Sequence, residues 1–222
     1  MTDDTSGGVP GHGPAPMTAA AGGAGAVLPE PWRLPFELAW QSLRADSRPV
    51  GAALLDPEGT VVAAGRNRSR EATAPAGQLA GTDLAHAEIN ALARLPAGRR
   101  HPGHRLYTTL EPCLLCSGAL IHAHVPHVVY AAADDRWRGV ERVPEAGGAI
   151  AARWARREGP LTGPLRPLAR FSRFLLDVWA VRHTPDRVPD GPAAREARRR
   201  LAAGLLDAPD AEAACNLFLA PS

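Results

Sequence analysis

Two short motifs constrain this chain more than any other feature of its sequence: His86-Ala87-Glu88 and Pro112-Cys113-Leu114-Leu115-Cys116. His86 and Cys113 lie 27 positions apart. One imidazole and two thiolates are ligands that Zn²⁺ favours in tetrahedral sites, and three protein ligands leave the fourth position to water. We therefore expect a fold that brings two distant segments together around a catalytic zinc ion, bound by His86, Cys113 and Cys116. Glu88 would move protons to and from the bound water.

Turn signals and apolar runs indicate how these motifs are positioned. Apolar runs at 50–55 and 60–64 flank the turn Asp56-Pro57-Glu58-Gly59, which predicts a β-hairpin. Strands are predicted at 105–110 and 127–133, with a helix over 112–124 between them. A strand–helix–strand unit of this kind joins parallel strands through a right-handed crossover. The sheet should therefore be mixed.

Further helices are predicted at 31–45, from Thr82 or Asp83 to 95, and at 149–157, 169–183 and 192–206. Each motif would then open a helix. Two helix N-termini that face one point favour negative charge there, which would stabilise both thiolates and a bound hydroxide.

The composition of the N-terminal segment bears on where the folded part begins and on the expected compartment. Residues 1–27 are rich in Gly, Pro and Ala, which predicts a disordered tail. Asp3 and Asp4 stand where a signal peptide carries basic residues, and no run of 18 apolar residues occurs, so we expect a cytoplasmic protein without a membrane partner. In that compartment a C-x-x-C pair more often binds metal or reacts as a redox dithiol than forms a structural disulfide.

The segment from about Pro49 to Asp134 resembles the cytidine and deoxycytidylate deaminase superfamily, and most closely the branch of bacterial tRNA adenosine deaminases and guanine deaminases. The resemblance rests on residues 49–52, 65–68, 86–92 and 106–122. H-x-E followed by P-C-x-x-C is the signature of zinc deaminases. The resemblance implies the α/β class: a three-layer α/β/α fold with a mixed central sheet. It also implies Zn²⁺ as cofactor and a homodimer.

Roles for individual residues follow from the same resemblance. It implies that Glu88 is the proton shuttle, that Asn67 hydrogen-bonds the base, and that the backbone beside Ala87 helps to hold it. In the tRNA branch the acid that matches Asp134 contacts nucleotide. Trp137 could stack on a base, and a solvated loop is the alternative for both of these residues.

We interpret residues 28–145 as the zinc deaminase domain and 146–222 as a helical C-terminal extension packed on it. The expected reaction is hydrolytic deamination of a nucleobase, nucleoside or related small aminated heterocycle: a zinc hydroxide attacks the amine-bearing ring carbon and ammonia leaves. The long C-terminus, which suggests a pocket wall, favours this small substrate. Deamination of tRNA adenosine to inosine is the runner-up, and a non-catalytic zinc-stabilised RNA-binding protein is the remote alternative.

Other features have two interpretations each. His122, His124 and His127 could bind a second metal or serve as surface and packing residues. The stretch Arg195–Arg200 could bind phosphates or form a solvated helix face, and Cys215 is most simply a small buried hydrophobe.

Overall fold

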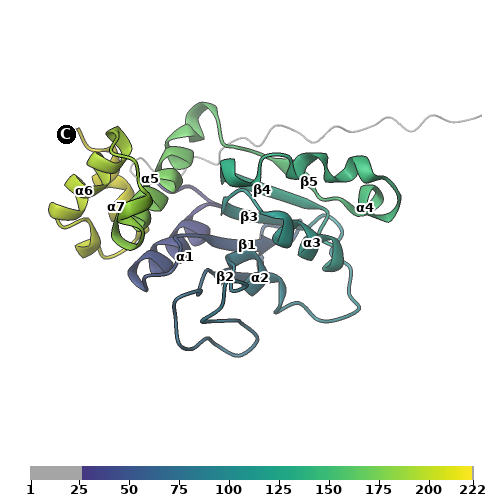
Figure 1. Ribbon diagram of the computed structural model, residues 1–222. Coiled ribbons are helices and arrows are strands. Elements are labelled where there is room, and N and C mark those ends of the chain that lie inside the picture. The colour runs from purple at the N-terminus through teal and green to yellow at the C-terminus, as the bar shows by residue number, and fades with distance from the viewer. Residues whose placement is uncertain (1–26, 222) are drawn as a thin grey trace, which may run out of the picture.

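The computed structural model describes residues 27–221, so all of the predicted tail except Val27 lies outside the described residues. Five strands form one mixed sheet in the order β2-β1-β3-β4-β5 (Figure 1). The strands are β1 (Gly51–Leu55), β2 (Val61–Arg66), β3 (Arg105–Leu110), β4 (His127–Ala132) and β5 (Arg156–Glu158). β1 pairs antiparallel with β2 and β3, whereas β3, β4 and β5 are parallel. The predicted hairpin and the parallel crossover are both confirmed.

Helices cover both faces of this sheet. On one face α2 (Ala87–Leu92) and α3 (Leu114–His122) pack on strand residues such as Leu54 and Leu106. On the other face, α1 (Arg33–Arg44) and α5 (Arg166–His183) pack on the alternate strand residues, such as Ala53 and Tyr107. Alternate residues of a strand face opposite sides, so β1 and β3 supply both cores. The three-layer α/β/α fold is confirmed.

The C-terminal region is helical, as predicted, with two departures. α4 (Gly148–Arg153) ends earlier than expected, and Arg156–Glu158 pair with β4 as a fifth strand instead of continuing the helix. α6 (Pro192–Ala202) is followed by an unpredicted helix, α7 (Ala211–Leu219). α7 packs on α1 and α5, and α6 packs on α5. Cys215 of α7 is fully buried.

The two helices that carry the motifs begin later than the sequence predicted. His86 has extended backbone angles (φ −72°, ψ 155°) and is the N-cap of α2, because the backbone N–H of Arg68 donates to Ala85 O and holds the preceding residues in a loop. Cys113 is likewise extended (φ −68°, ψ 178°) and N-caps α3. Both motifs still lie at helix N-termini. None of the helices described is long and apolar enough to cross a bilayer.

Candidate active site

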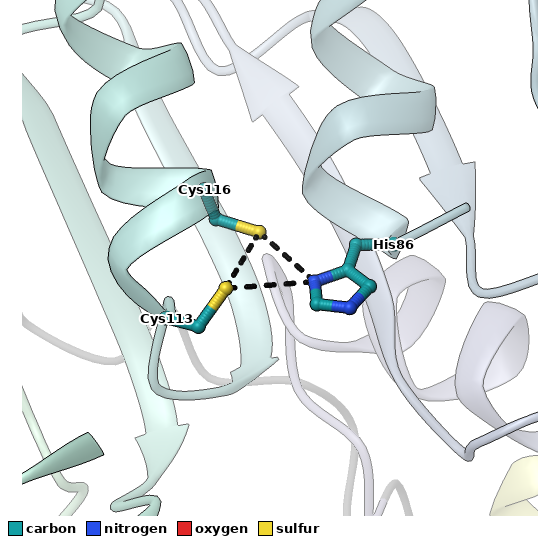
Figure 2. A group of neighbouring side chains, drawn as sticks. All are labelled: His86, Cys113 and Cys116. Atoms are coloured by element: carbon teal, nitrogen blue, oxygen red, sulfur yellow. Dashed lines mark hydrogen bonds between the residues drawn. The ribbon is translucent and has the colours of Figure 1, made fainter. Parts of the chain in front are cut away.

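Three side chains from two helix N-termini meet at one point (Figure 2). The Nδ1 atom of His86 lies 3.3 Å from Cys116 Sγ and 3.6 Å from Cys113 Sγ, and the two sulfurs are 3.6 Å apart. Tetrahedral zinc bonds of about 2.0 Å to nitrogen and 2.3 Å to sulfur place such ligand atoms about 3.5–3.8 Å apart. The three donors therefore fit a zinc ion. In the described part of the chain no other cluster of His, Cys, Asp or Glu brings its ligand atoms this close together.

The electrostatics of the cluster favour a thiolate at Cys113. Its hydrogen bonds with Cys116 and His86 lower the pKa of Cys113 to about 4 against the opposing effect of burial. The hydrogen bond to Cys113 also raises the pKa of His86, and the nearby Glu88 carboxylate adds to this effect. A thiolate is the form of cysteine that binds metal.

Glu88 lies beside this cluster with only 4% of its surface exposed. Its Oε2 accepts a hydrogen bond from Cys116 Sγ at 3.4 Å, and its Oε1 accepts one from Thr108 Oγ1 at 3.3 Å. Burial raises the pKa of Glu88, since desolvation disfavours the carboxylate. A carboxyl group with a raised pKa can both accept and donate a proton near neutral pH. Thr108 lies in the segment that resembles the deaminase superfamily, but no role was predicted for it; it contacts Glu88 because its side chain lies on the α2 side of β3.

A cavity of about 50 Å³ opens beside the cluster. It lies at the carboxyl ends of the parallel strands β3 and β4, where open α/β sheets place their ligands. Its lining includes all of the predicted site residues except Cys116, namely Asn67, His86, Ala87, Glu88, Cys113, Asp134 and Trp137. The sequence did not single out its other lining residues, Arg48, Val50, Leu110 and Glu111.

The predicted base-binding residues differ in how they are held. Asn67 is 3% exposed, and its Oδ1 accepts the backbone N–H of Ser69 at 3.0 Å. Within residues 27–221 its Nδ2 has no hydrogen-bond acceptor and remains a donor for a ligand. Asp134 is fixed by the backbone N–H of Arg136, which donates to Oδ1 at 3.1 Å, whereas Trp137 is 41% exposed at the cavity rim.

A nearly buried ion pair that the sequence did not predict supports the Cys113 end of the site. Arg157 on β5 donates to Glu111 Oε1 at 2.9 Å, to the Pro112 carbonyl at 3.2 Å and to Ser117 Oγ at 3.0 Å. The other carboxylate oxygen of Glu111 accepts the Asp134 backbone N–H at 3.2 Å. This network ties the residues on both sides of Cys113 to the sheet and to the loop that carries Asp134.

The remaining candidates lie away from the cluster. His127, the first residue of β4, lies 3.2 Å from the Glu158 carboxylate on β5, and His122 and His124 lie at the far end of α3. On α6, Arg198 pairs with Asp190, and both Arg199 and Arg200 pair with Glu196. These contacts favour packing and surface roles.

Residues 32–132 match the family model of the cytidine and deoxycytidylate deaminase zinc-binding region. The chain belongs to this deaminase family. The cofactor of the family is zinc, and the His86, Cys113 and Cys116 cluster is the site in this chain that fits it.

Two curated relatives extend this result. A tRNA-specific adenosine deaminase from Haemophilus influenzae is 35% identical over 105 residues, which are 46% of this chain and 56% of the relative. A tRNA(Ile)-lysidine synthase from Deinococcus radiodurans is 33% identical over 176 residues, 75% of this chain and 28% of the relative. The chain thus spans only about a quarter to just over half of the length of these relatives.

Solved structures are also similar to this chain. One in complex with 2,6-diaminopurine has 26% sequence identity and a TM-score of 0.50, and it covers 77% of this chain and 88% of its own. Guanine deaminase from Nitrosomonas europaea has 28% identity and a TM-score of 0.45 over 65% of this chain and 80% of its own. The 77% coverage exceeds the 32–132 segment, so the likeness extends beyond the zinc-binding region.

Proposed function

We propose that this protein catalyses the hydrolytic deamination of a nucleobase, nucleoside or related small aminated heterocycle. One observation carries the proposal: the buried Glu88 carboxylate lies next to the zinc ligands and lines the same cavity as Asn67 and Trp137. A structural zinc site needs no buried carboxylate at its open side, whereas a hydrolytic site does need a proton carrier there.

The residues of the site have separate roles in this reaction. His86, Cys113 and Cys116 would hold the zinc ion, which would supply an activated water for attack on the amine-bearing ring carbon. Glu88 would take one proton from the attacking water and pass it to the ring nitrogen; it would then take the hydroxyl proton of the tetrahedral adduct and pass it to the amine, which leaves as ammonia while the carbonyl forms. Both thiols lose their protons on binding metal, so Cys116 no longer donates to Oε2 and that oxygen becomes available. Thr108 continues to orient the carboxylate through Oε1.

Three residues would hold the base. The Asn67 Nδ2 donates to a ring acceptor, the backbone at Ala87 contacts the edge of the ring, and the exposed Trp137 indole stacks on it. Asp134, at the end of β4, contacts the sugar side of the ligand.

The substrate proposed first is a small one, in particular an aminated purine. The structure in complex with 2,6-diaminopurine aligns with 77% of this chain and so includes much of its C-terminal region. Helix α5 of that region lines a neighbouring space that shares Arg48, Leu110 and Asp134 with the cavity beside the zinc cluster. The second candidate is tRNA adenosine, which the 35% identity to a tRNA-specific adenosine deaminase favours.

A substrate panel tests the proposal directly. Ammonia release is measured from free bases, nucleosides, nucleotides and a tRNA anticodon stem-loop, with the zinc-loaded protein and with Glu88→Gln. We expect turnover of at least one aminated base, lowered by about 10³-fold or more in the variant. Glu58→Gln, at the exposed turn of the hairpin, is the matched control and should keep full activity. Equal activity of Glu88→Gln and Glu58→Gln would overturn the assignment.

We further propose a homodimer. Leu114 and Leu115 on α3 are 50% and 42% exposed, which leaves an apolar surface beside the zinc site. Light scattering of the full chain should give twice the mass of 23.4 kDa, and a monomer at micromolar concentration would contradict this.

A further inference from the structure

A second cavity, of about 220 Å³, adjoins the one beside the zinc cluster. The two cavities share Arg48, Leu110 and Asp134 as lining residues. The outer wall of the second cavity comes from α5 and from the turn Pro185–Arg187 that follows it. A ligand with its base beside Glu88 would therefore extend into this second space.

The charge of the second cavity is unusual. Four arginines line it against two aspartates; the arginines are Arg48, Arg136, Arg173 and Arg187, and the aspartates are Asp134 and Asp177. Burial raises the pKa of Asp177 against the opposing charge of Arg173, and the Asp134 carboxylate already accepts the Arg136 backbone N–H. We call this cavity the arginine pocket.

The guanidinium groups of the arginine pocket have acidic neighbours, Asp134 and Asp177, but neither of these lies within ion-pair distance. Across residues 27–221, no ion pair involves Arg48, Arg136, Arg173 or Arg187. Arg173 makes one hydrogen bond, from Nη1 to the Ala133 carbonyl at 3.2 Å. By contrast, Arg182 on the same helix pairs with Asp46 at 2.7 Å. Unpaired donors that converge on one cavity are the groups that recognise a phosphate.

Arg48 is the central residue because it borders both cavities. Its side chain is half-buried, and its guanidinium lies 5.1 Å from the centre of the Trp179 ring, which holds it in place. Burial and the nearby charge of Arg136 lower the pKa of Arg48, against the opposing charges of Asp134 and Asp83. A half-buried cation beside other cations is unfavourable by itself, and a bound anion would offset this.

We propose that the arginine pocket binds the phosphate group of the substrate, so that the chain deaminates an aminated nucleotide in preference to the free base or nucleoside. This inference rests on the proposed deaminase function. With the base beside Glu88, the sugar passes Asp134 and the phosphate reaches Arg48, Arg173 and Arg187. Several charge-assisted hydrogen bonds to one phosphate favour the nucleotide over the nucleoside by about 100-fold or more in kcat/KM.

The phosphate could belong to a mononucleotide or to an RNA strand, and the experiment separates these sources. kcat/KM is measured for the base, nucleoside and 5′-monophosphate of adenine, guanine and cytosine, and for a tRNA anticodon stem-loop. Preference for a monophosphate over its nucleoside identifies a free nucleotide. Turnover of the stem-loop alone, with the same arginine dependence, identifies a phosphate of the RNA backbone.

Variants locate the effect. Arg187→Gln, which borders only the arginine pocket, should lower kcat/KM for the phosphorylated substrate about 10- to 100-fold and leave the nucleoside rate unchanged within twofold. Arg48→Gln should do the same with some loss for the nucleoside, because it borders both cavities. Arg198→Gln on α6 lines neither cavity and should have no effect. Raising the salt concentration should raise KM for the phosphorylated substrate only.

The outcomes test the phosphate site separately from the proposed deaminase function. Equal kcat/KM for nucleoside and nucleotide, with no effect of Arg187→Gln on either, would overturn the phosphate site while the deaminase function stands. Absence of turnover for the whole panel would overturn the proposed function itself. In that case calorimetry still tests whether the arginine pocket binds phosphate. A nucleoside monophosphate and inorganic phosphate are titrated into the zinc-loaded protein and into Arg187→Gln. Weaker binding to the variant supports the phosphate site, and equal binding overturns it.

Discussion

Replacing Arg157 with Gln tests the network that holds the zinc-binding turn. The substitution removes hydrogen bonds to Glu111, Pro112 and Ser117 at 2.9–3.2 Å. The two charged side chains are 10% and 14% exposed, so Glu111 would be left as a nearly buried, uncompensated carboxylate. Breaking a buried ion pair from one side costs about 3–5 kcal/mol. The Asp134 N–H still donates to Glu111 in the variant, so we expect a loss of unfolding free energy at the low end of this range, about 3 kcal/mol.

The assay is thermal unfolding of the zinc-loaded protein. For a domain of this size we expect Arg157→Gln to lower Tm by about 6–12 °C. Arg156→Gln is the matched control, because Arg156 is the preceding residue of the same strand and pairs with Glu158 at the surface, with 63% and 39% exposure. A pair exposed in this way contributes about 0–1 kcal/mol, so the control should lower Tm by less than about 4 °C.

The double variant Arg157→Gln, Glu111→Gln sharpens the test. It removes both charges, so it should be more stable than the sum of the two single losses predicts, by about 1.5 kcal/mol or more. Arg157→Gln should also speed the loss of zinc to a chelator, since Pro112 and Ser117 flank the turn from Cys113 to Cys116. Equal Tm values for Arg157→Gln and Arg156→Gln, or strictly additive losses in the double variant, would refute this role for the network.

Two further predictions concern the thiols and the packing of α2. When zinc is removed at pH 7, a thiol reagent should modify Cys113 first because its pKa is lowered to about 4; Cys215, fully buried with its pKa raised to about 12, should react only on unfolding. Reaction of Cys215 in the folded protein would contradict its placement. Gly65→Ala should destabilise the fold by more than about 2 kcal/mol in denaturant titration, since its Cβ would lie 2.4 Å from the Ala91 backbone N. Gly118→Ala, in helix α3 with open space around it, should instead stabilise by about 0.5–1 kcal/mol, and a similar loss in both variants would refute the packing explanation.

The zinc cluster and the central strands could be predicted from the sequence because their signals are local. His86, Cys113 and Cys116 lie in two short windows whose chemistry is specific, and the hairpin turn and apolar runs define β1 to β4. Helix starts were less certain, because a loop residue with extended backbone such as His86 looks the same in sequence as a helical one. The Asp210 side chain accepts the Ala213 N–H at 2.8 Å, a cap signal that could have predicted α7.

The supporting residues could not be predicted because their partners are distant in sequence. Arg157 is one of many arginines in the chain and contacts residues 40–46 positions earlier. It lies on β5, whose sequence Arg-Arg-Glu has no apolar alternation, so only pairing with β4 makes it a strand. Arg48 and Arg187 likewise come together only through the packing of α5 against the carboxyl ends of β3 and β4.

The most direct test of the central claim is a titration of the zinc-free protein with zinc, in which deaminase activity and bound metal are followed together. The zinc cluster and Glu88 predict that activity rises in proportion to bound zinc and saturates at about one zinc ion per chain. Glu88→Gln should bind zinc with the same stoichiometry and stay inactive. Activity that is already complete without zinc, or a zinc-loaded Glu88→Gln protein with near-normal turnover, would contradict the account.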